Sequence, residues 1–384
     1  MHKPIKIIFD ASPLLGPKTG VAYYIERLVG QLARQYPNDI ELVGFYYNFL
    51  GRNNTANLPC APNIRYRPIR FIPSKIVYQL RRFGIELPLE LLAKERADFA
   101  LFGNFLGYPS LAKTPAAPVV HDLTYLDLPD YVATKNRNDL TRFVPEQIKR
   151  SRFVITVSEF SKQKITDQYN TDPNHILVTP IPPEPPKLLD EIERLELLKK
   201  LGLSRPFLLF VGTVEPRKNI IALIDAYQQL PQNLQKHYTL VIAGRIGWNC
   251  DAEIARLQTA RDQGLNVLHL GYVSNDERTA LYQSAELFTT ASHYEGFGMP
   301  VLEAMSFGLP CAVSDIPVFH EVASSSVLYF DQNNPKSIAR TWQGILSDEK
   351  AWEKLADAST TQAGHFKWEA VARSVYEYIS REVR

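Results

Sequence analysis

The chain has 384 residues, which exceeds the size at which single hydrophobic cores stop growing, so we expect two domains. Hydrophobic residues make up 45% of the sequence and charged residues 22%, as in an ordinary globular protein, and this argues against a disordered chain. The formal net charge is only +2. Because nucleic-acid-binding proteins are normally strongly basic, we expect no nucleic-acid partner.

The three cysteines, Cys60, Cys250 and Cys311, are too few and too scattered for a disulfide framework. They also lack the spacing of a zinc site, so we expect no bound metal. The N-terminal apolar run is too short for a signal peptide, and no stretch approaches the roughly 18 apolar residues of a membrane span. We therefore expect a protein of the reducing cytoplasm.

Charge is unevenly distributed in the first quarter of the chain. No acidic residue lies between Glu41 and Glu86, whereas seven basic residues do: Arg52, Arg65, Arg67, Arg70, Lys75, Arg81 and Arg82. Apolar residues are interleaved with the last of them. Two interpretations stay open: residues 52–82 contact the inner face of a membrane or a lipid-diphosphate acceptor, or they form a plain solvated basic surface.

The N-terminal half alternates short apolar runs with helical patterns. A strand is predicted at Ile5–Phe9, an apolar-periodic helix at residues 21–32, and a second strand at residues 41–46, which is the rhythm of a parallel sheet. Later strands are predicted at residues 99–102, 118–120 and 153–157, the last of them followed by a helix that Ser158 or Ser161 could cap. These runs are continuous rather than alternating, as expected of strands covered on both faces.

A proline-rich segment separates the two halves. Five prolines lie between Pro180 and Pro186, which forbids a helix or a central strand and favours an extended linker. After a charged helix near residues 189–201, strands are predicted at residues 207–211, 239–243, 267–270, 287–289 and 311–314. The sequence thus predicts an α/β protein of two doubly wound, Rossmann-like domains, with ligands beyond the carboxyl ends of the strands.

The most specific segment, residues 291–310, follows a predicted strand and opens a helix. Gly296 and Gly298 let the backbone approach a ligand closely, and Pro300 suits the first turn of a helix. Free amides at the helix N-terminus favour an anion. Glu303 is placed to accept hydrogen bonds from a ribose diol, and Glu295 from another hydroxyl-rich group. The alternative is a capped surface helix with two solvated glutamates.

A second segment, residues 207–220, contains a strand, a turn at Gly212 and the basic pair Arg217 and Lys218 before a helix. Cations at a helix N-terminus oppose the helix dipole, so the pair is unfavourably placed unless an anion lies beside it. A diphosphate would supply that anion. The alternative is an ordinary loop with exposed charges.

Taken together, these motifs resemble glycosyltransferase family 4, the retaining nucleotide-sugar transferases of the GT-B fold. The resemblance covers nearly the whole chain. It is carried by Phe-Val-Gly-Thr-Val-Glu-Pro-Arg-Lys-Asn, Leu-Val-Ile-Ala-Gly-Arg, Leu-Gly-Tyr-Val-Ser and, most specifically, Glu-Gly-Phe-Gly-Met-Pro-Val-Leu-Glu-Ala.

The resemblance implies roles for residues of the C-terminal half. Glu295 would hold hydroxyls of the donor sugar, Glu303 would hold the ribose, and Arg217 with Lys218 would stabilise the departing diphosphate. The remaining donor contacts would come from the amides of Gly296, Phe297 and Gly298 and from the backbone around Tyr272 and Val273.

The N-terminal half carries three further candidates. The family places a histidine against the transferring sugar, and His121 matches it, although a lone histidine at a strand end is more often structural. Gly16 and Gly20 match a glycine-rich turn near the donor phosphate and the acceptor. The terminal helix of the family fold crosses back to the first domain. This implies an acceptor domain of residues 1–180 plus 367–384, a linker of residues 181–185, and a nucleotide-sugar domain of residues 186–366.

The implied activity is that of a retaining hexosyltransferase in cell-surface polysaccharide synthesis. The phosphate loop resembles that of bacterial mannosyltransferases, so GDP-mannose is the expected donor, with UDP-glucose and rhamnosyl donors behind it, and a glycan or lipid-linked sugar the expected acceptor. No Asp-x-Asp motif occurs, so we expect neither a metal nor a cofactor besides the donor. Two alternatives stay open: a catalytically silent nucleotide-sugar-binding protein and a nucleotide-sugar epimerase.

Overall fold

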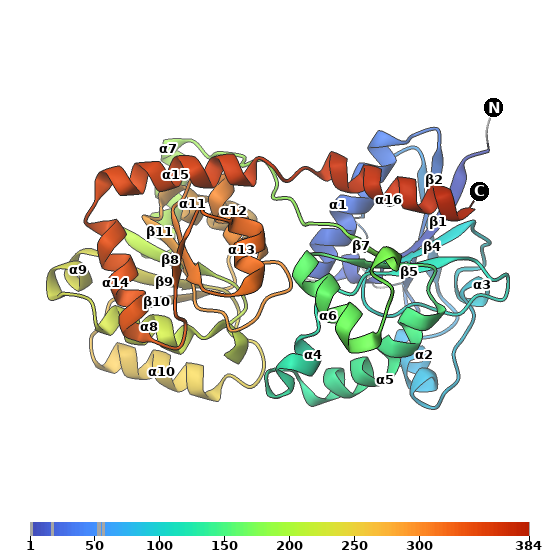
Figure 1. Ribbon diagram of the computed structural model, residues 1–384, viewed down its shortest axis with the longest axis horizontal. Helices are drawn as coiled ribbons and strands as arrows, with labels where there is room; N and C mark the ends of the chain where they lie inside the picture. The colour runs from blue at the N-terminus through green and yellow to red at the C-terminus, as the bar shows by residue number, and fades with distance from the viewer. Residues whose placement is uncertain (1–2, 17–18, 52–54, 56–57, 384) are drawn as a thin grey trace. The chain divides into compact units, whose positions relative to one another are not determined.

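The computed structural model describes residues 3–16, 19–51, 55 and 58–383. It divides into two compact units, each with its own parallel sheet and surrounding helices (Figure 1). The first unit comprises Met1–Leu126, Lys135–Ile181 and Lys367–Arg384, and the second comprises Asp127–Thr134 and Pro182–Phe366.

The first unit is built on a five-stranded parallel sheet of order β3-β2-β1-β4-β5. Its strands are β1 (Ile5–Asp10), β2 (Ile40–Tyr47), β3 (Ile64–Ile69), β4 (Phe99–Phe102) and β5 (Ala116–Pro118). A bridge between Val119 and Ile155 continues it toward a pair formed by β6 (Val154–Thr156) and β7 (Ile176–Val178). Strand β4 is buried along its whole length, as expected for strands with helices on both faces.

Helices surround this sheet. They are α1 (Gly20–Gln35), α2 (Ser74–Arg82), α3 (Leu89–Ala93), α5 (Thr134–Arg150), α6 (Glu159–Tyr169) and, from the end of the chain, α16 (Trp368–Val383), with α4 (Thr124–Asp127) at the boundary of the units. Ser158 caps α6 as predicted, because its side chain accepts a hydrogen bond from the Ser161 amide. Helix α16 packs on α1, where the rings of Tyr36 and Tyr376 stack with centroids 3.9 Å apart.

The second unit has a six-stranded parallel sheet of order β10-β9-β8-β11-β12-β13. The strands are β8 (Phe207–Val211), β9 (Thr239–Ala243), β10 (Val267–Gly271), β11 (Leu287–Thr290), β12 (Cys311–Ser314) and β13 (Leu328–Phe330). From β8 the chain first builds outward through β9 and β10, then returns to pair β11 against β8 and builds the other way. The order therefore reverses between β8 and β11, and open α/β sheets bind ligands at such a switch point.

Nine helices are described in the second unit: α7 (Glu191–Lys200), α8 (Ile220–Gln228), α9 (Gln232–His237), α10 (Asp251–Asp262), α11 (Asn275–Ser284), α12 (Met299–Ser306), α13 (Pro317–Ala323), α14 (Pro335–Leu346) and α15 (Glu349–Ala363). The core joins the apolar side chains of β8 and β9 to those of α8 and α14, including the fully buried Trp342. The Trp342 indole donates a hydrogen bond to the Thr289 hydroxyl at 3.1 Å, so this buried N–H is satisfied.

Short one-turn 3-10 helices complete the secondary structure at Ser12–Leu15, Pro129–Tyr131, Pro173–His175 and Pro216–Lys218. No helix or strand lies between Val178 and Glu191, where the sequence predicted an extended linker. Among the helices of the described residues, none is long and apolar enough to cross a membrane.

The structure differs from the predictions for residues 118–120 and for residues 127–134. The strand predicted at residues 118–120 is Ala116–Pro118, followed by the single bridge at Val119. Residues 127–134, which the prediction placed in the N-terminal domain, belong to the second unit. There the Trp248 indole donates to the Tyr131 carbonyl at 2.8 Å, and the ring of Tyr131 lies 5.8 Å from that of His293.

Candidate functional site

The two loops that the sequence singled out follow neighbouring strands of the second unit. Strands β8 and β11 are paired, so the segment after β8 and the segment after β11 leave the same edge of the sheet. Two hydrogen bonds to main-chain carbonyls join them: the His293 amide donates to the Arg217 carbonyl at 2.9 Å, and the Arg217 guanidinium donates to the Tyr294 carbonyl at 2.6 Å. Segments almost 80 residues apart thus form one surface.

At this surface Glu295 is the centre of an ion-pair network. Its two carboxylate oxygens accept from the Arg217 guanidinium at 2.7 Å and from the Lys218 ammonium at 2.5 Å. The Ser292 hydroxyl donates to it at 2.8 Å, and Arg217 also pairs with Glu215 at 2.6 Å. The structure therefore brings together Glu295, Arg217 and Lys218, three of the four predicted catalytic residues.

Burial makes this network electrostatically strong. Glu215 is only 3% exposed, and Lys218 and Glu295 are each 8% exposed. Burial by itself raises the pKa of Glu295, but the charges and hydrogen bonds of Arg217 and Lys218 outweigh it and lower that pKa to about 2. Glu295 is consequently ionised at neutral pH and can act only as a hydrogen-bond acceptor.

The basic pair has protein anions beside it in the folded chain. Sequence proximity showed only that Arg217 and Lys218 precede α8, where the helix dipole is unfavourable to them. In the folded chain Glu295 and Glu215 supply the counter-charges. Any diphosphate at this place must therefore compete with a carboxylate for the same N–H groups.

Glycines shape the backbone on both sides of the network. Gly298 precedes α12 with a φ of 97°, and a Cβ there would lie 2.6 Å from Cε1 of Phe319, so only glycine fits without strain. A Cβ on Gly244, after β9, would lie 1.7 Å from the Gly212 carbonyl oxygen. Pro300 is in the first turn of α12, as its residue type favours.

Glu303, from α12, has different surroundings from Glu295. The Tyr282 hydroxyl donates to it at 3.1 Å, and an Arg278 nitrogen lies 3.9 Å from the same oxygen. Burial raises the Glu303 pKa, against the lowering effect of Arg278 and of the Tyr282 hydroxyl. The side chain keeps 14% of its surface exposed, so an incoming hydroxyl group can reach it.

The other donor-side candidates surround the same sheet edge. The segment Gly296, Phe297 and Gly298 runs directly into α12, with Phe297 buried against Phe366 at 5.9 Å between ring centroids. Tyr272 and Val273 follow β10, and the Tyr272 side chain is 66% exposed with the Arg245 guanidinium 5.6 Å from its ring centroid.

The remaining candidates belong to the first unit. His121 follows β5, and its Nε2–H donates to the Gly103 carbonyl at 2.9 Å, which leaves Nδ1 as the nitrogen without a proton. Tyr24 and Phe105 make edge contacts with its ring, and burial lowers its pKa, so His121 is neutral at pH 7.

Gly16 and Gly20 flank residues 17–18, which lie outside the described residues. Gly16 has an extended backbone and open space where a Cβ would be, so its conformation does not require glycine. Gly20 is the first residue of α1, after the Thr19 cap.

Most of the basic side chains in residues 52–82 are already paired within the first unit. Arg65 contacts Glu41 and Glu95, Arg81 contacts Glu86, and Arg82 contacts Asp139, with Arg67 also on Glu95. Carboxylates outside residues 52–82 thus neutralise a stretch that has none of its own, which favours the plain-surface interpretation. Arg52 lies outside the described residues.

Residues 193–362 match the family model "Glycosyl transferases group 1". This match lies within the second unit and contains Arg217, Lys218, Glu295 and Glu303. The second unit carries a glycosyl transferases group 1 domain. The chain is therefore a glycosyltransferase.

Two curated relatives are mannosyltransferases of Escherichia coli. "O-antigen chain mannosyltransferase B" is 27% identical over 388 residues, which cover 95% of this chain and 97% of that protein. "Serotype-specific mannosyltransferase WbdA" is 30% identical over 270 residues, which cover 68% of this chain but only 33% of that protein. Among solved structures, sucrose-phosphate synthase from Thermosynechococcus elongatus superposes with a TM-score of 0.74 at 16% identity, over 98% of both chains. The glycosyltransferase has the GT-B fold predicted from its sequence.

Several residues of the candidate site were not singled out by the sequence. Glu215 lies two residues before Arg217 in the same motif, and Ser292 lies three residues before Glu295. The sequence therefore predicts that each lies close to the site. Their role as partners was not predictable, because it depends on the adjacency of β8 and β11. Tyr282 and Arg278, which contact Glu303, come from α11 and had no recognisable signal. Among the described residues, no three His, Cys, Asp or Glu side chains gather as metal ligands.

Proposed function

We propose that this glycosyltransferase moves mannose from GDP-mannose to a glycan or lipid-linked acceptor in cell-surface polysaccharide synthesis. The names of the two relatives support mannose as the sugar and a surface polysaccharide as the product. The proposal includes family 4 membership, retention of the anomeric configuration and a metal-independent reaction. It assigns the donor to the second unit and the acceptor to the first.

The observation that carries the proposal is the buried network of Arg217, Lys218 and Glu295 at the switch point of the sheet. Breaking a sugar–diphosphate bond places charge on the leaving phosphate oxygens, and fixed cations in a dry site stabilise that charge best. Both cations are already positioned here by Glu295, and Arg217 also by the Tyr294 carbonyl. A diphosphate that takes over their N–H groups meets them without much reorganisation.

The same exchange gives Glu295 its role. Once the diphosphate engages Arg217 and Lys218, the Glu295 carboxylate has free lone pairs for hydroxyls of the donor sugar. Glu303 accepts from the ribose in place of the Tyr282 hydroxyl. The amides of residues 296–298 and the backbone of Tyr272 and Val273 complete the donor contacts.

The first unit contributes the remaining proposed residues. His121 acts on the transferring sugar as a neutral imidazole with Nδ1 unprotonated, which suits accepting a hydrogen bond. Gly16 and Gly20 lie near the donor phosphate and the acceptor. We also propose a cytoplasmic protein that meets its acceptor at the inner face of the membrane.

The test is a screen of donor consumption by the purified chain across common nucleotide sugars, with release of nucleoside diphosphate as the readout. GDP-mannose is expected to be turned over in preference to UDP-glucose and dTDP-rhamnose. Turnover of another donor, with none of GDP-mannose, would reject the donor while keeping the transferase. No turnover of any donor with a lipid-linked glycan present would reject the proposed function.

A further inference from the structure

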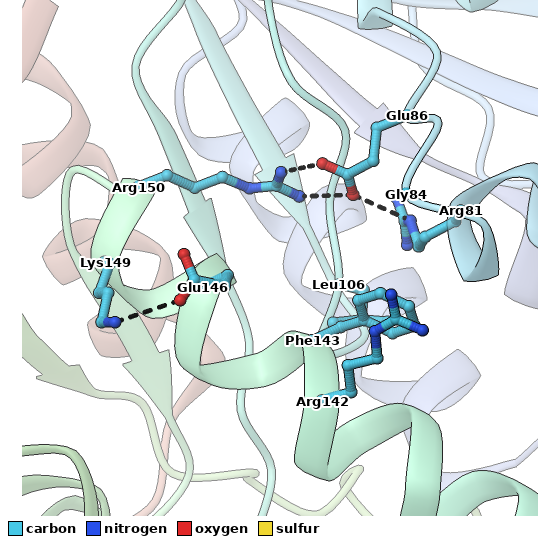
Figure 2. Close-up of a pocket in the computed structure, with 9 residues that line it drawn as sticks. All are labelled: Arg81, Gly84, Glu86, Leu106, Arg142, Phe143, Glu146, Lys149 and Arg150. Carbon is cyan, nitrogen blue, oxygen red and sulfur yellow. Dashed lines mark hydrogen bonds and ion pairs between the residues drawn. The ribbon is translucent and has the colours of Figure 1, made fainter.

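The first unit contains a cavity of about 490 Å³, a size typical of small-molecule sites. One wall is a single face of α5, because Arg142, Phe143, Glu146, Lys149 and Arg150 recur at helical spacing (Figure 2). The facing wall comes from the end of α2 and the turn after it, with Arg81, Gly84 and Glu86, and Leu106 also lines the cavity. None of these residues belongs to the proposed donor site.

The lining has more cations than anions. Glu86 is shared by two guanidiniums, since it accepts from Arg81 at 3.1 Å and also pairs with Arg150. Glu146 pairs with Lys149 at 3.1 Å. Arg142 donates to the Arg82 carbonyl at 2.9 Å and lies 5.0 Å from the Phe143 ring centroid, and no carboxylate of the described residues pairs with it. Four cations thus face two carboxylates.

Burial increases the effect of that excess. The Arg81 side chain is only 9% exposed, and Arg81 and Arg150 both donate to the Gly107 carbonyl, which fixes them in the wall. The lining side chains carry a net charge of +2, which attracts an anion to a partly enclosed cavity. The planar guanidinium group of arginine can donate two hydrogen bonds to the oxygens of a phosphate group.

The apolar part of the cavity further restricts the class of ligand that would fit. Leu106 and Phe143 line it, and the neighbours of Gly84 in the sequence, Phe83 and Ile85, are 83% and 53% exposed. A phosphate ester or diphosphate, which joins an anionic head to a less polar remainder, matches both features. A diphosphate diester also carries two negative charges, equal to the excess of the lining.

We propose that this cavity binds a phosphoryl anion, either a diphosphate or a phosphate ester. In the transferase this anion is the charged group of the acceptor. That assignment to the acceptor rests on the proposed function, whereas the binding itself does not.

The test localises binding by hydrogen exchange of the full chain with inorganic pyrophosphate as the probe. Pyrophosphate is expected to slow exchange in residues 81–86 and 142–150. Arg142→Gln should weaken this protection about tenfold, since it removes one charge-assisted hydrogen-bond donor. Arg70→Gln removes the same charge from an exposed position outside the cavity and should leave the protection unchanged. Thermal unfolding of both variants checks that they fold alike.

The exchange experiment has two arms, which distinguish a free phosphoryl anion from one carried by a lipid. Vesicles of phosphatidylcholine with phosphatidic acid replace pyrophosphate in the second arm, and plain phosphatidylcholine vesicles are its blank. Protection in both arms supports a lipid-borne phosphate, and protection by pyrophosphate alone supports a free phosphoryl ligand. No protection of residues 142–150 in either arm, or equal protection in Arg142→Gln, overturns the proposal. The donor screen tests the proposed function separately, because its readout is the release of nucleoside diphosphate and not the protection of residues 81–86 and 142–150.

Discussion

At the scale of single residues, the site depends on a carboxylate that keeps two cations in place. Glu295 is buried, yet its pKa is about 2, because Arg217 and Lys218 favour its charged form more than burial opposes it. A carboxyl group whose pKa is lower in the folded state than in the unfolded state stabilises the fold at pH values above its unfolded-state pKa. That stabilisation disappears as the pH falls through the folded pKa.

Replacing the carboxylate tests this directly. Glu295→Gln should destabilise the second unit by about 3–5 kcal/mol at neutral pH, because it removes the carboxylate that pairs with the buried Lys218. The difference from wild type should shrink by about 3 kcal/mol as the pH falls from 4.5 toward 2. Denaturant unfolding across this pH range measures it. Glu353→Gln, at an exposed position of α15, is the control, and a pH-independent difference would contradict the assigned pKa.

The sequence identified the members of this network but not their pairing. Glu295, Arg217 and Lys218 each came from a recognisable motif. Arg217 and Glu295 are 78 residues apart, and only the order of the strands brings them together. A sequence read locally therefore favoured an external anion.

At the scale of elements, the buried strands were the most predictable part. Strands β4, β8, β9 and β12 have the predicted bounds, because both of their faces are covered and their sequences are continuously apolar. Strand β3 was not predicted, since Ile-Arg-Tyr-Arg-Pro-Ile contains two arginines and a proline, which only an edge strand tolerates. Strands β7 and β13 have three residues each, too few for a periodic signal.

The turn into α12 is an element whose geometry can be tested. Gly298→Ala forces a side chain into a φ of 97° and against Phe319, so it should lower the stability of the second unit by about 1–3 kcal/mol and weaken donor binding. Calorimetric unfolding and a donor titration measure both effects.

Gly344→Ala is the matched control for that substitution. It lies inside α14 with open space around its Cβ, so alanine should be neutral or stabilising by up to about 1 kcal/mol. Equal stability of Gly298→Ala and wild type would show that the turn does not need glycine.

At the scale of the molecule, composition predicted two units and a proline-rich linker, but it did not predict which residues belong to each unit. Residues 127–134 follow an N-terminal strand, yet they join the second unit through contacts such as that between Trp248 and Tyr131. Helix α16 ends the chain and belongs to the first unit, where it covers α1. Composition gave no sign of this, and only the family resemblance assigned residues 367–384 to the N-terminal domain. Both assignments depend on long-range packing.

This membership has a thermodynamic consequence. Ile379 is fully buried in α16, and Ile379→Ala should destabilise the first unit by about 2–5 kcal/mol through the lost burial and the cavity left behind. Hydrogen exchange should show the loss in the sheet of β1 to β5 and not in β8 to β13. Ile192→Ala, at a site 72% exposed in α7, should change neither. Equal loss in both sheets after Ile379→Ala would contradict the assignment.

The central claim is that Arg217 and Lys218 stabilise the leaving diphosphate, and the rate of mannose transfer from GDP-mannose by Lys218→Ala tests it most directly. The account predicts a loss of about 10²–10³ in kcat, by analogy with the removal of one fixed donor from an oxyanion hole. Lys236→Ala, an exposed lysine of α9, should transfer at the wild-type rate. A folded Lys218→Ala variant with an undiminished kcat would contradict the claim.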